Sequence, residues 1–185
     1  MTRAPLPVVL IGPMAAGKSR VARCLAGRYG MAHADSDQVV EARHGSIAQL
    51  FRERGEAEFR RLEAEVVAEL LDDPRYAEGV ISLGGGAPMS PLVQPLLAGR
   101  TVAYVDVDLA AVRPRIRGGA SRPLLQPDPE TRWSQIMAER RETFERLATI
   151  TLDARAPRSA SQIAHDLHTA LGATGRSEPR KDHTA

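Results

Sequence analysis

The sequence predicts an α/β fold of three layers, in which helices cover both faces of a central, mostly parallel sheet. Two observations lead to this prediction. Short apolar runs typical of buried strands alternate along the 185 residues with segments of helical periodicity. In addition, the first apolar run, Val8–Ile11, leads directly through a glycine-containing turn into a helix. Such a start is typical of a strand–helix–strand unit, and the ligand site of such a sheet lies at the carboxyl ends of its strands.

Each expected strand is a run of apolar or β-branched residues, and each expected helix has an apolar face or a capping residue. Gly30 is expected to end the first helix, and Gly55 to separate two helices. Asp108 is placed to cap a short helix that meets Pro114. The expected strands are residues 8–11, 31–34, 80–83, 101–107 and 149–152. Besides the helix that Asp108 caps, the expected helices are residues 19–29, 47–54, 56–71, 91–98, 129–148 and 161–171. Residues 115–128 are expected to form a mobile surface loop.

Residues 12–19 form the pattern G-x-x-x-x-G-K-S directly after the first strand. A buried strand that turns sharply into a helix leaves backbone N–H groups pointing at one spot, where a polyphosphate binds. Lys18 would reach the outer phosphates, and the Ser19 hydroxyl would ligate the Mg²⁺ that bridges them. Lys18 is also one of two lysines against twenty-three arginines. We therefore expect a nucleotide triphosphate here, rather than a chance match in a glycine-rich turn.

Arginines occupy apolar faces of two expected helices. In residues 129–148, a rotation of 100° per residue places the apolar side chains on one face of the helix, and Arg140 falls at the centre of this apolar stripe. In residues 56–71, Glu63 lies within the apolar stripe and Arg60 at its edge. The first stripe consists of Trp133, Ile136, Met137, Phe144 and Leu147. An arginine on such a face either binds an anionic substrate, snorkels to water or pairs with a buried carboxylate. Arg141 and Arg146, outside the stripe, are expected to be solvated.

Asp35 and Asp37 follow the second strand and point the same way. Beside a nucleotide, one carboxylate can hold the metal and the other can orient an attacking hydroxyl or take its proton. The alternative is an Asp-rich turn. His33 and His44 have no metal-ligand spacing, and the single cysteine, Cys24, fits the apolar face of a helix and is expected to be a buried thiol.

The bulk composition excludes several functional classes. The formal charge is only +2, and no basic stripe is interleaved with the few aromatic residues, so nucleic acid is not expected as a partner. No stretch approaches the eighteen apolar residues of a membrane span, and the amino-terminal residues contain no long apolar h-region. We expect a cytoplasmic protein without membrane contact.

The motifs between Val8 and Leu171 resemble those of the shikimate kinases, and they occur in the same order. They are residues 12–19, Asp35-Ser-Asp37, residues 58–63, residues 83–87, residues 121–125 and residues 137–140. The resemblance implies a P-loop fold like that of the nucleoside monophosphate kinases, with a five-stranded parallel sheet. It also implies one kinase domain, residues 1–172, with core residues 7–34 and 78–110, a substrate-binding segment 35–72 and a lid at about 113–128. Residues 173–185 are expected to form a disordered tail.

The resemblance implies that ATP phosphorylates the 3-hydroxyl of shikimate, with one Mg²⁺ per subunit, in chorismate and aromatic amino-acid biosynthesis. Asp37 would bind the shikimate hydroxyls and orient or deprotonate the attacking one, while Asp35 and Ser19 would act at the metal. Arg60 and Arg140 would clamp the carboxylate. The other implied substrate-binding residues are Gly84, Gly85, Gly86 and Glu63, and the other implied catalytic residues are Lys18 and Arg122, a lid arginine. The implied ATP-binding residues are Gly12, Met14, Ala15, Ala16, Gly17, Lys18, Ser19, Arg20, Arg115, Arg117, Arg122, Arg155 and Arg158.

The sequence departs from the family pattern at Ala15, where glycine is common. If the backbone there needs a positive φ, alanine costs about 1 kcal/mol. The adenine-stacking arginine of the family corresponds to either Arg115 or Arg117, and a second adenine-side arginine to Arg155 or Arg158.

We expect a monomer that acts on shikimate and ATP. The alternatives are a P-loop kinase for another small hydroxy acid such as gluconate, and a non-catalytic, nucleotide-dependent regulator. A guanine-reading N-K-x-D motif is impossible, because the chain contains no asparagine.

Overall fold

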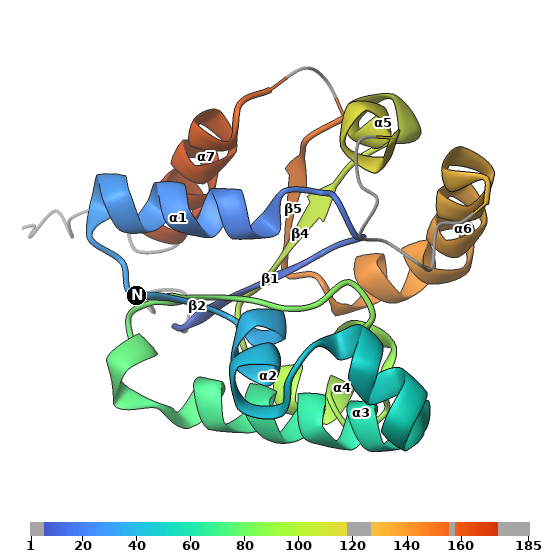
Figure 1. Ribbon diagram of the computed structural model, residues 1–185. Coiled ribbons are helices and arrows are strands. Elements are labelled where there is room, and N and C mark those ends of the chain that lie inside the picture. Colours follow the sequence, from blue (N-terminus) through green and yellow to red (C-terminus); the bar gives the residue numbers. More distant parts are fainter. Residues whose placement is uncertain (1–5, 118–126, 156–157, 174–185) are drawn as a thin grey trace, which may run out of the picture.

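A five-stranded, all-parallel sheet forms the centre of the computed structural model, which describes residues 6–117, 127–155 and 158–173. The strands lie in the order β2-β3-β1-β4-β5 (Figure 1). They are β1 (Val8–Ile11), β2 (His33–Asp35), β3 (Val80–Ser82), β4 (Val102–Asp106) and β5 (Ile150–Asp153). The central strands β1, β3 and β4 are buried along their whole length, because helices cover both faces. The predicted fold class and the number of strands are confirmed.

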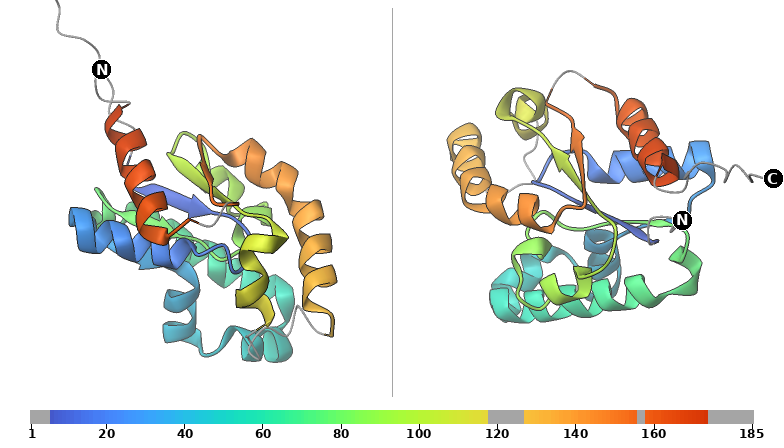
Figure 2. Two further views of the ribbon diagram at one scale, coloured as in Figure 1. Left: turned by 90° about the horizontal axis from the view of Figure 1, so that it is seen from above. Right: turned by 180° about the vertical axis from the view of Figure 1, so that it is seen from behind.

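The helices form a layer on each side of this sheet. Figures 1 and 2 show α1 and α7 on one face and α2, α3 and α4 on the other. The helices are α1 (Lys18–Tyr29), α2 (Ser36–His44), α3 (Ile47–Asp72), α4 (Gln94–Leu97), α5 (Leu109–Arg117), α6 (Pro129–Leu147) and α7 (Ala160–Ala173), with the 3₁₀ turns η1 (Pro74–Tyr76) and η2 (Ala87–Met89). None of the described helices is both long and apolar enough to cross a membrane.

Two glycines end or break helices where the sequence predicts it. Gly30 caps α1 in the left-handed conformation, with a φ of 68°. Gly55 has a φ of 80° and a ψ of 169°, so the chain leaves the helical conformation there and divides α3 into the two expected segments. This break separates Ile47 and the start of α3 from the part that carries Arg60 and Glu63.

Helix α2 is the element that the sequence prediction missed. It begins at the Asp35 N-cap, whose side chain accepts hydrogen bonds from the backbone N–H groups of Asp37 and Gln38 at 3.1 and 3.4 Å. The acidic cap with a glutamine three residues later is a variant of the capping box, which could have indicated this helix. A capped helix therefore follows β2 and fixes the Asp37 side chain near the sheet edge.

Helix α5 continues through Pro114 to Arg117, so the prediction of a loop from residue 115 is wrong for its first three residues. Tertiary contacts outweigh the poor helix propensity of proline here. Ile116 is almost completely buried, and both Arg113 and Arg117 form ion pairs with Glu130 of α6. Residues 118–126 of the predicted lid lie outside the described residues.

Two glycines of α1 provide a matched test of these backbone assignments. Gly27 lies in the helix interior and Gly30 at its C-cap, and an added Cβ would meet nothing within 4 Å at either position. Gly27→Ala should raise the free energy of unfolding by about 0.5–1 kcal/mol, because alanine favours the helix. Gly30→Ala should lower it by about 1 kcal/mol, because a Cβ is strained at positive φ. Urea denaturation measures both, and changes of the same sign would contradict the assignment.

Candidate functional site

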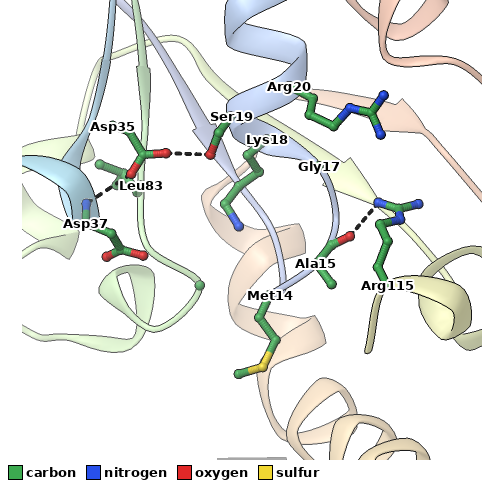
Figure 3. Close-up of a pocket in the computed structure, with 11 residues that line it drawn as sticks. Met14, Ala15, Gly17, Lys18, Ser19, Arg20, Asp35, Asp37, Leu83 and Arg115 are labelled. Atoms are coloured by element: carbon green, nitrogen blue, oxygen red, sulfur yellow. Dashed lines mark hydrogen bonds between the residues drawn. The ribbon is translucent and has the colours of Figure 1, made fainter. Parts of the chain in front are cut away.

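The segments that follow β1, β2 and β3 meet at the carboxyl edge of the sheet and, with Arg115 of α5, surround a cavity of about 350 Å³ (Figure 3). The cavity is lined by Met14, Ala15, Gly17, Lys18, Ser19, Arg20, Asp35, Asp37, Leu83, Gly85 and Arg115. Of these, only Leu83 was absent from the predicted site, because an apolar residue at a strand end carries no chemical signal. Residues predicted from four separate segments of the sequence therefore lie around one cavity.

The phosphate loop, residues 12–19, has the tight backbone that its glycines predict. A Cβ on Gly12 would lie 2.8 Å from the carbonyl oxygen of Val105, and Gly12 and Gly17 have φ values of 142° and 95°. Ala15 also has a positive φ, 65°, and is the only described residue other than glycine to do so. The sequence predicts strain at Ala15 only if its φ is positive. The structure meets this condition, so alanine costs about 1 kcal/mol relative to glycine here.

Lys18 lies inside the phosphate loop and is 8% exposed. Its Nζ donates hydrogen bonds of 2.9 Å to the carbonyl oxygens of Gly12 and Pro13. Burial lowers the pKa of Lys18 to about 8, although the nearby carboxylates of Asp37 and Asp35 oppose the shift. A nearly desolvated ammonium group is therefore held at the cavity, where an anionic ligand would favour its charged form.

Asp35 connects the phosphate loop to α2. One carboxylate oxygen accepts a hydrogen bond from the Ser19 hydroxyl at 2.5 Å, and the other caps α2 through the Asp37 N–H (Figure 3). The described residues contain no group of three or more His, Cys, Asp or Glu side chains that could hold a metal ion. The Ser19 and Asp35 oxygens nevertheless suit Mg²⁺, which is commonly bound by one or two protein oxygens together with substrate phosphates.

Asp37 lies between the phosphate loop and the glycines that follow β3. Burial and the neighbouring carboxylate of Asp35 raise its pKa, against the attraction of Lys18. A Cβ on Gly84 would lie 2.3 Å from Oδ1 of Asp37, so only glycine permits this approach. The Gly84 N–H donates to the buried Ser36 hydroxyl at 3.1 Å, which holds the glycine backbone against α2. Asp37 therefore packs directly on the glycine loop.

The predicted pair of arginines lies on the other side of the glycine loop. Arg60 forms an ion pair of 2.6 Å with Glu63, which is 1% exposed, and a Cβ on Gly86 would lie 2.7 Å from Nη2 of Arg60. Arg140 donates from Nη1 to the carbonyl oxygen of Gly85 at 3.1 Å. Burial and then the charge of Arg60 lower the pKa of Arg140. Two guanidinium groups close enough to repel each other form a site suited to an anion.

Besides Arg20, which lines the cavity, four predicted arginines lie outside the phosphate loop and differ in position. Arg115 lines the cavity and donates to the carbonyl oxygen of Ala15, whereas Arg117 pairs with Glu130 away from the loop. Arg155 contacts Asp153 and Asp106, and Arg158 contacts Asp153 and Asp166, and neither lines the cavity. Arg122 lies outside the described residues. The structure thus brings only Arg115 of these residues to the phosphate loop.

The expectation that Arg141 is only solvated is wrong. Its Nη1 lies 3.2 Å from the carboxylate of Asp106, a residue that is 6% exposed and that also accepts from the Tyr104 hydroxyl. A buried carboxylate at the end of a central strand needs a cationic partner. This requirement could have indicated from the sequence that Asp106 pairs with an arginine. Arg146, by contrast, is exposed and donates to the Gln94 side chain. The Arg141 contact fastens α6, and with it Arg140, to β4.

Comparison with known proteins gives the following similarities. The family model described as shikimate kinase matches residues 14–171. A shikimate kinase from Streptomyces coelicolor is 41% identical over 166 residues, which cover 88% of this chain and 95% of that protein. One from Mycobacterium tuberculosis is 40% identical over 161 residues, which cover 86% and 90%. The structure of a shikimate kinase from Acinetobacter baumannii in complex with shikimate superposes with a TM-score of 0.85 at 28% identity, covering 94% of this chain and 96% of that one.

The raised pKa of Asp37 predicts a stability that depends on pH. Between the ordinary value of 3.8 and the raised native pKa, the native state binds more protons than the unfolded chain. Stability therefore falls as pH rises through this window. Asp37→Asn should raise the melting temperature at pH 7, and the gain should shrink as the pH approaches 3.8.

Asp35→Ala is the control for this experiment, because it removes the cap of α2 and should lower stability by about 1 kcal/mol. Thermal unfolding followed by circular dichroism measures both variants. A lower melting temperature of Asp37→Asn at pH 7 would show that the ionised carboxylate stabilises the fold, contrary to this prediction.

Proposed function

This chain belongs to the shikimate kinase family, and we propose that it transfers the γ-phosphoryl group of ATP to the 3-hydroxyl of shikimate. The position of Asp37 carries this proposal. Asp37 lies between Lys18 of the phosphate loop and the glycine loop that contacts Arg60 and Arg140. A substrate with a carboxylate on the two arginines would therefore present its hydroxyl groups to Asp37, next to the phosphates.

Asp37 is the residue that we assign to the attacking hydroxyl. Its carboxylate would accept the hydrogen bond of the 3-hydroxyl and either orient it or take its proton. The raised pKa makes Asp37 a stronger base than an ordinary aspartate. The new bond joins the substrate oxygen to the γ-phosphorus, the bond between this phosphorus and the bridging oxygen breaks, and ADP leaves.

The phosphate loop would bind and orient the triphosphate. Backbone N–H groups of residues 12–19 and the helix dipole of α1 suit its charge, and Lys18 would turn from the carbonyl groups of the loop to the outer phosphates. The oxygens of Ser19 and Asp35 would hold one Mg²⁺ ion, which neutralises phosphate charge when it is bound. Of the arginines predicted near the nucleotide, Arg20 and Arg115 are the ones that we place beside it, since both line the cavity.

Arg60, Glu63 and Arg140 would select the carboxylate of the second substrate. Glu63 holds the Arg60 guanidinium in one orientation, and the carbonyl group of Gly85 holds that of Arg140. Both planar groups are thus preorganised to grip a carboxylate, which lowers the entropic cost of binding. The expected monomer and the role of Arg122 both stay predictions.

A coupled assay of ADP formation tests the proposed function. With ATP and Mg²⁺, the protein should release ADP only when shikimate is present, and quinate or gluconate should support far less turnover. Asp37→Ala should reduce kcat by about 10²- to 10⁴-fold, because it removes the group that orients the hydroxyl, while ADP binding persists. Absence of shikimate-dependent turnover in the unmodified protein would overturn the proposal.

The arginine pair predicts a selective effect on substrate affinity. Arg140→Ala should raise the KM for shikimate about 10- to 100-fold, since a hydrogen bond between charged groups contributes about 1.5–3 kcal/mol. The KM for ATP should change little. Arg146→Ala, an exposed arginine on the same helix, is the matched control and should leave both constants unchanged. Steady-state kinetics with each substrate varied decide the outcome, and an equal rise in both KM values would contradict the assigned role.

A further inference from the structure

Successive carbonyl groups of the phosphate loop accept hydrogen bonds from side chains of three different helices. Lys18 of α1 donates to the carbonyl groups of Gly12 and Pro13. The indole Nε1 of Trp133 on α6 donates to the carbonyl oxygen of Met14 at 3.1 Å, and Arg115 on α5 donates to that of Ala15. Each carbonyl group of residues 12–15 therefore accepts a hydrogen bond from a side chain.

Two of these bonds lie on either side of the strained residue of the loop. Ala15 has a φ of 65°, a conformation that alanine rarely adopts. The carbonyl group of Met14 belongs to the peptide unit before Ala15, and that of Ala15 belongs to the unit after it. A residue in such a conformation persists only where its surroundings determine it. Trp133 and Arg115 supply that constraint from two separate helices.

The bond from Trp133 also orients a donor. In a planar trans peptide the N–H and C=O groups point in opposite directions. The Met14 carbonyl group that Trp133 holds therefore sets the direction of the Ala15 N–H, which points away from the indole. Met14 and Ala15 both line the cavity. An N–H group whose direction is fixed beside that cavity is the kind of donor that binds a phosphate.

We propose that Trp133 is a positioning residue for the nucleotide phosphates, which acts by holding Ala15 and its N–H in the binding conformation. This inference rests on the proposed function, because it assumes that the loop binds a nucleotide. The sequence placed Trp133 only in an apolar stripe, and at 3% exposure it does pack in the core. A phenylalanine would satisfy that packing, but it has no N–H to donate.

The same helix also contacts the glycine loop. Arg140 lies two helical turns after Trp133 and donates to the carbonyl oxygen of Gly85. The two loops touch, because a Cβ on Gly85 would lie 2.9 Å from the backbone nitrogen of Met14. One face of α6 thus fixes both loops, whereas the Trp133 bond reaches only the phosphate loop. Loss of that bond should consequently affect the nucleotide more than the second substrate.

Calorimetric titration of the full chain with Mg-ADP, and separately with shikimate, tests the inference. Trp133→Phe should weaken Mg-ADP binding about 3- to 10-fold, the range expected for one lost hydrogen bond, and leave the Kd of shikimate within about two-fold. Ile136→Val, a conservative change at a buried position of the same face of α6, is the control, and it should leave the Kd of Mg-ADP unchanged.

Ala15→Gly distinguishes a positioning role from a purely structural one. Glycine adopts the left-handed conformation without strain, so the loop should then depend less on Trp133. In the Ala15→Gly background, Trp133→Phe should weaken Mg-ADP binding less than two-fold. The effects of the two substitutions would then be non-additive in a double-mutant cycle. Equal weakening in both backgrounds, or no weakening in either, would overturn the inference.

A measurement on the unmodified protein keeps the inference testable if Trp133→Phe does not fold. Trp133 is the only tryptophan of the chain, so its fluorescence reports on the indole alone. Saturation with Mg-ADP should change its emission, and the same titration of Ala15→Gly should give a smaller change. Identical changes in both proteins would count against the inference. If the unmodified protein binds no Mg-ADP at all, the proposed function fails instead.

Discussion

The absence of side chains at three consecutive positions after β3 is the constraint on which the site depends. Gly84, Gly85 and Gly86 each approach a different element so closely that a Cβ would lie 2.3 Å from Asp37, 2.9 Å from the Met14 backbone and 2.7 Å from Arg60. This turn is therefore the point at which the phosphate loop, α2 and α3 come together. A larger residue would push the phosphate loop away at position 85 and would displace the side chains of Asp37 and Arg60 at positions 84 and 86. The glycines therefore serve packing between segments rather than conformational freedom.

This close packing also determines the electrostatics of the site. Lys18, Asp37, Glu63 and Arg140 are all partly or wholly removed from water, and burial is the largest cause of the pKa shift of each. Such burial is unfavourable for folding unless opposite charges lie nearby. Of the described residues that line the cavity, Lys18, Arg20 and Arg115 are cationic, and Asp35 and Asp37 are anionic. A bound triphosphate would add negative charge beside these cations and so favour their charged forms.

The sequence predicts those parts of the structure that depend on local pattern. The strands, the phosphate loop, the break at Gly55 and the Arg60–Glu63 pair each follow from residues close together in the chain, and the structure contains all of them. Apart from helix α2, whose capping residues are local, the errors concern contacts between distant segments. Helix α5 passes Pro114 because Glu130, in another helix, binds arginines on both sides of it. The pairing of Arg141 with Asp106 likewise joins positions far apart in the sequence, which periodicity cannot reveal.

Ala15 shows why a local departure from the expected glycine can persist in such a loop. Alanine restricts the unfolded chain more than glycine, which offsets part of the strain at positive φ. Hydrogen bonds from Trp133 and Arg115 offset the rest of the strain energy. These two side chains need acceptors whichever residue occupies position 15. The Met14 and Ala15 carbonyl groups are those acceptors. Hydrogen bonds from α5 and α6 therefore help to hold the conformation of the phosphate loop, and the sequence pattern of such a loop does not by itself fix its geometry.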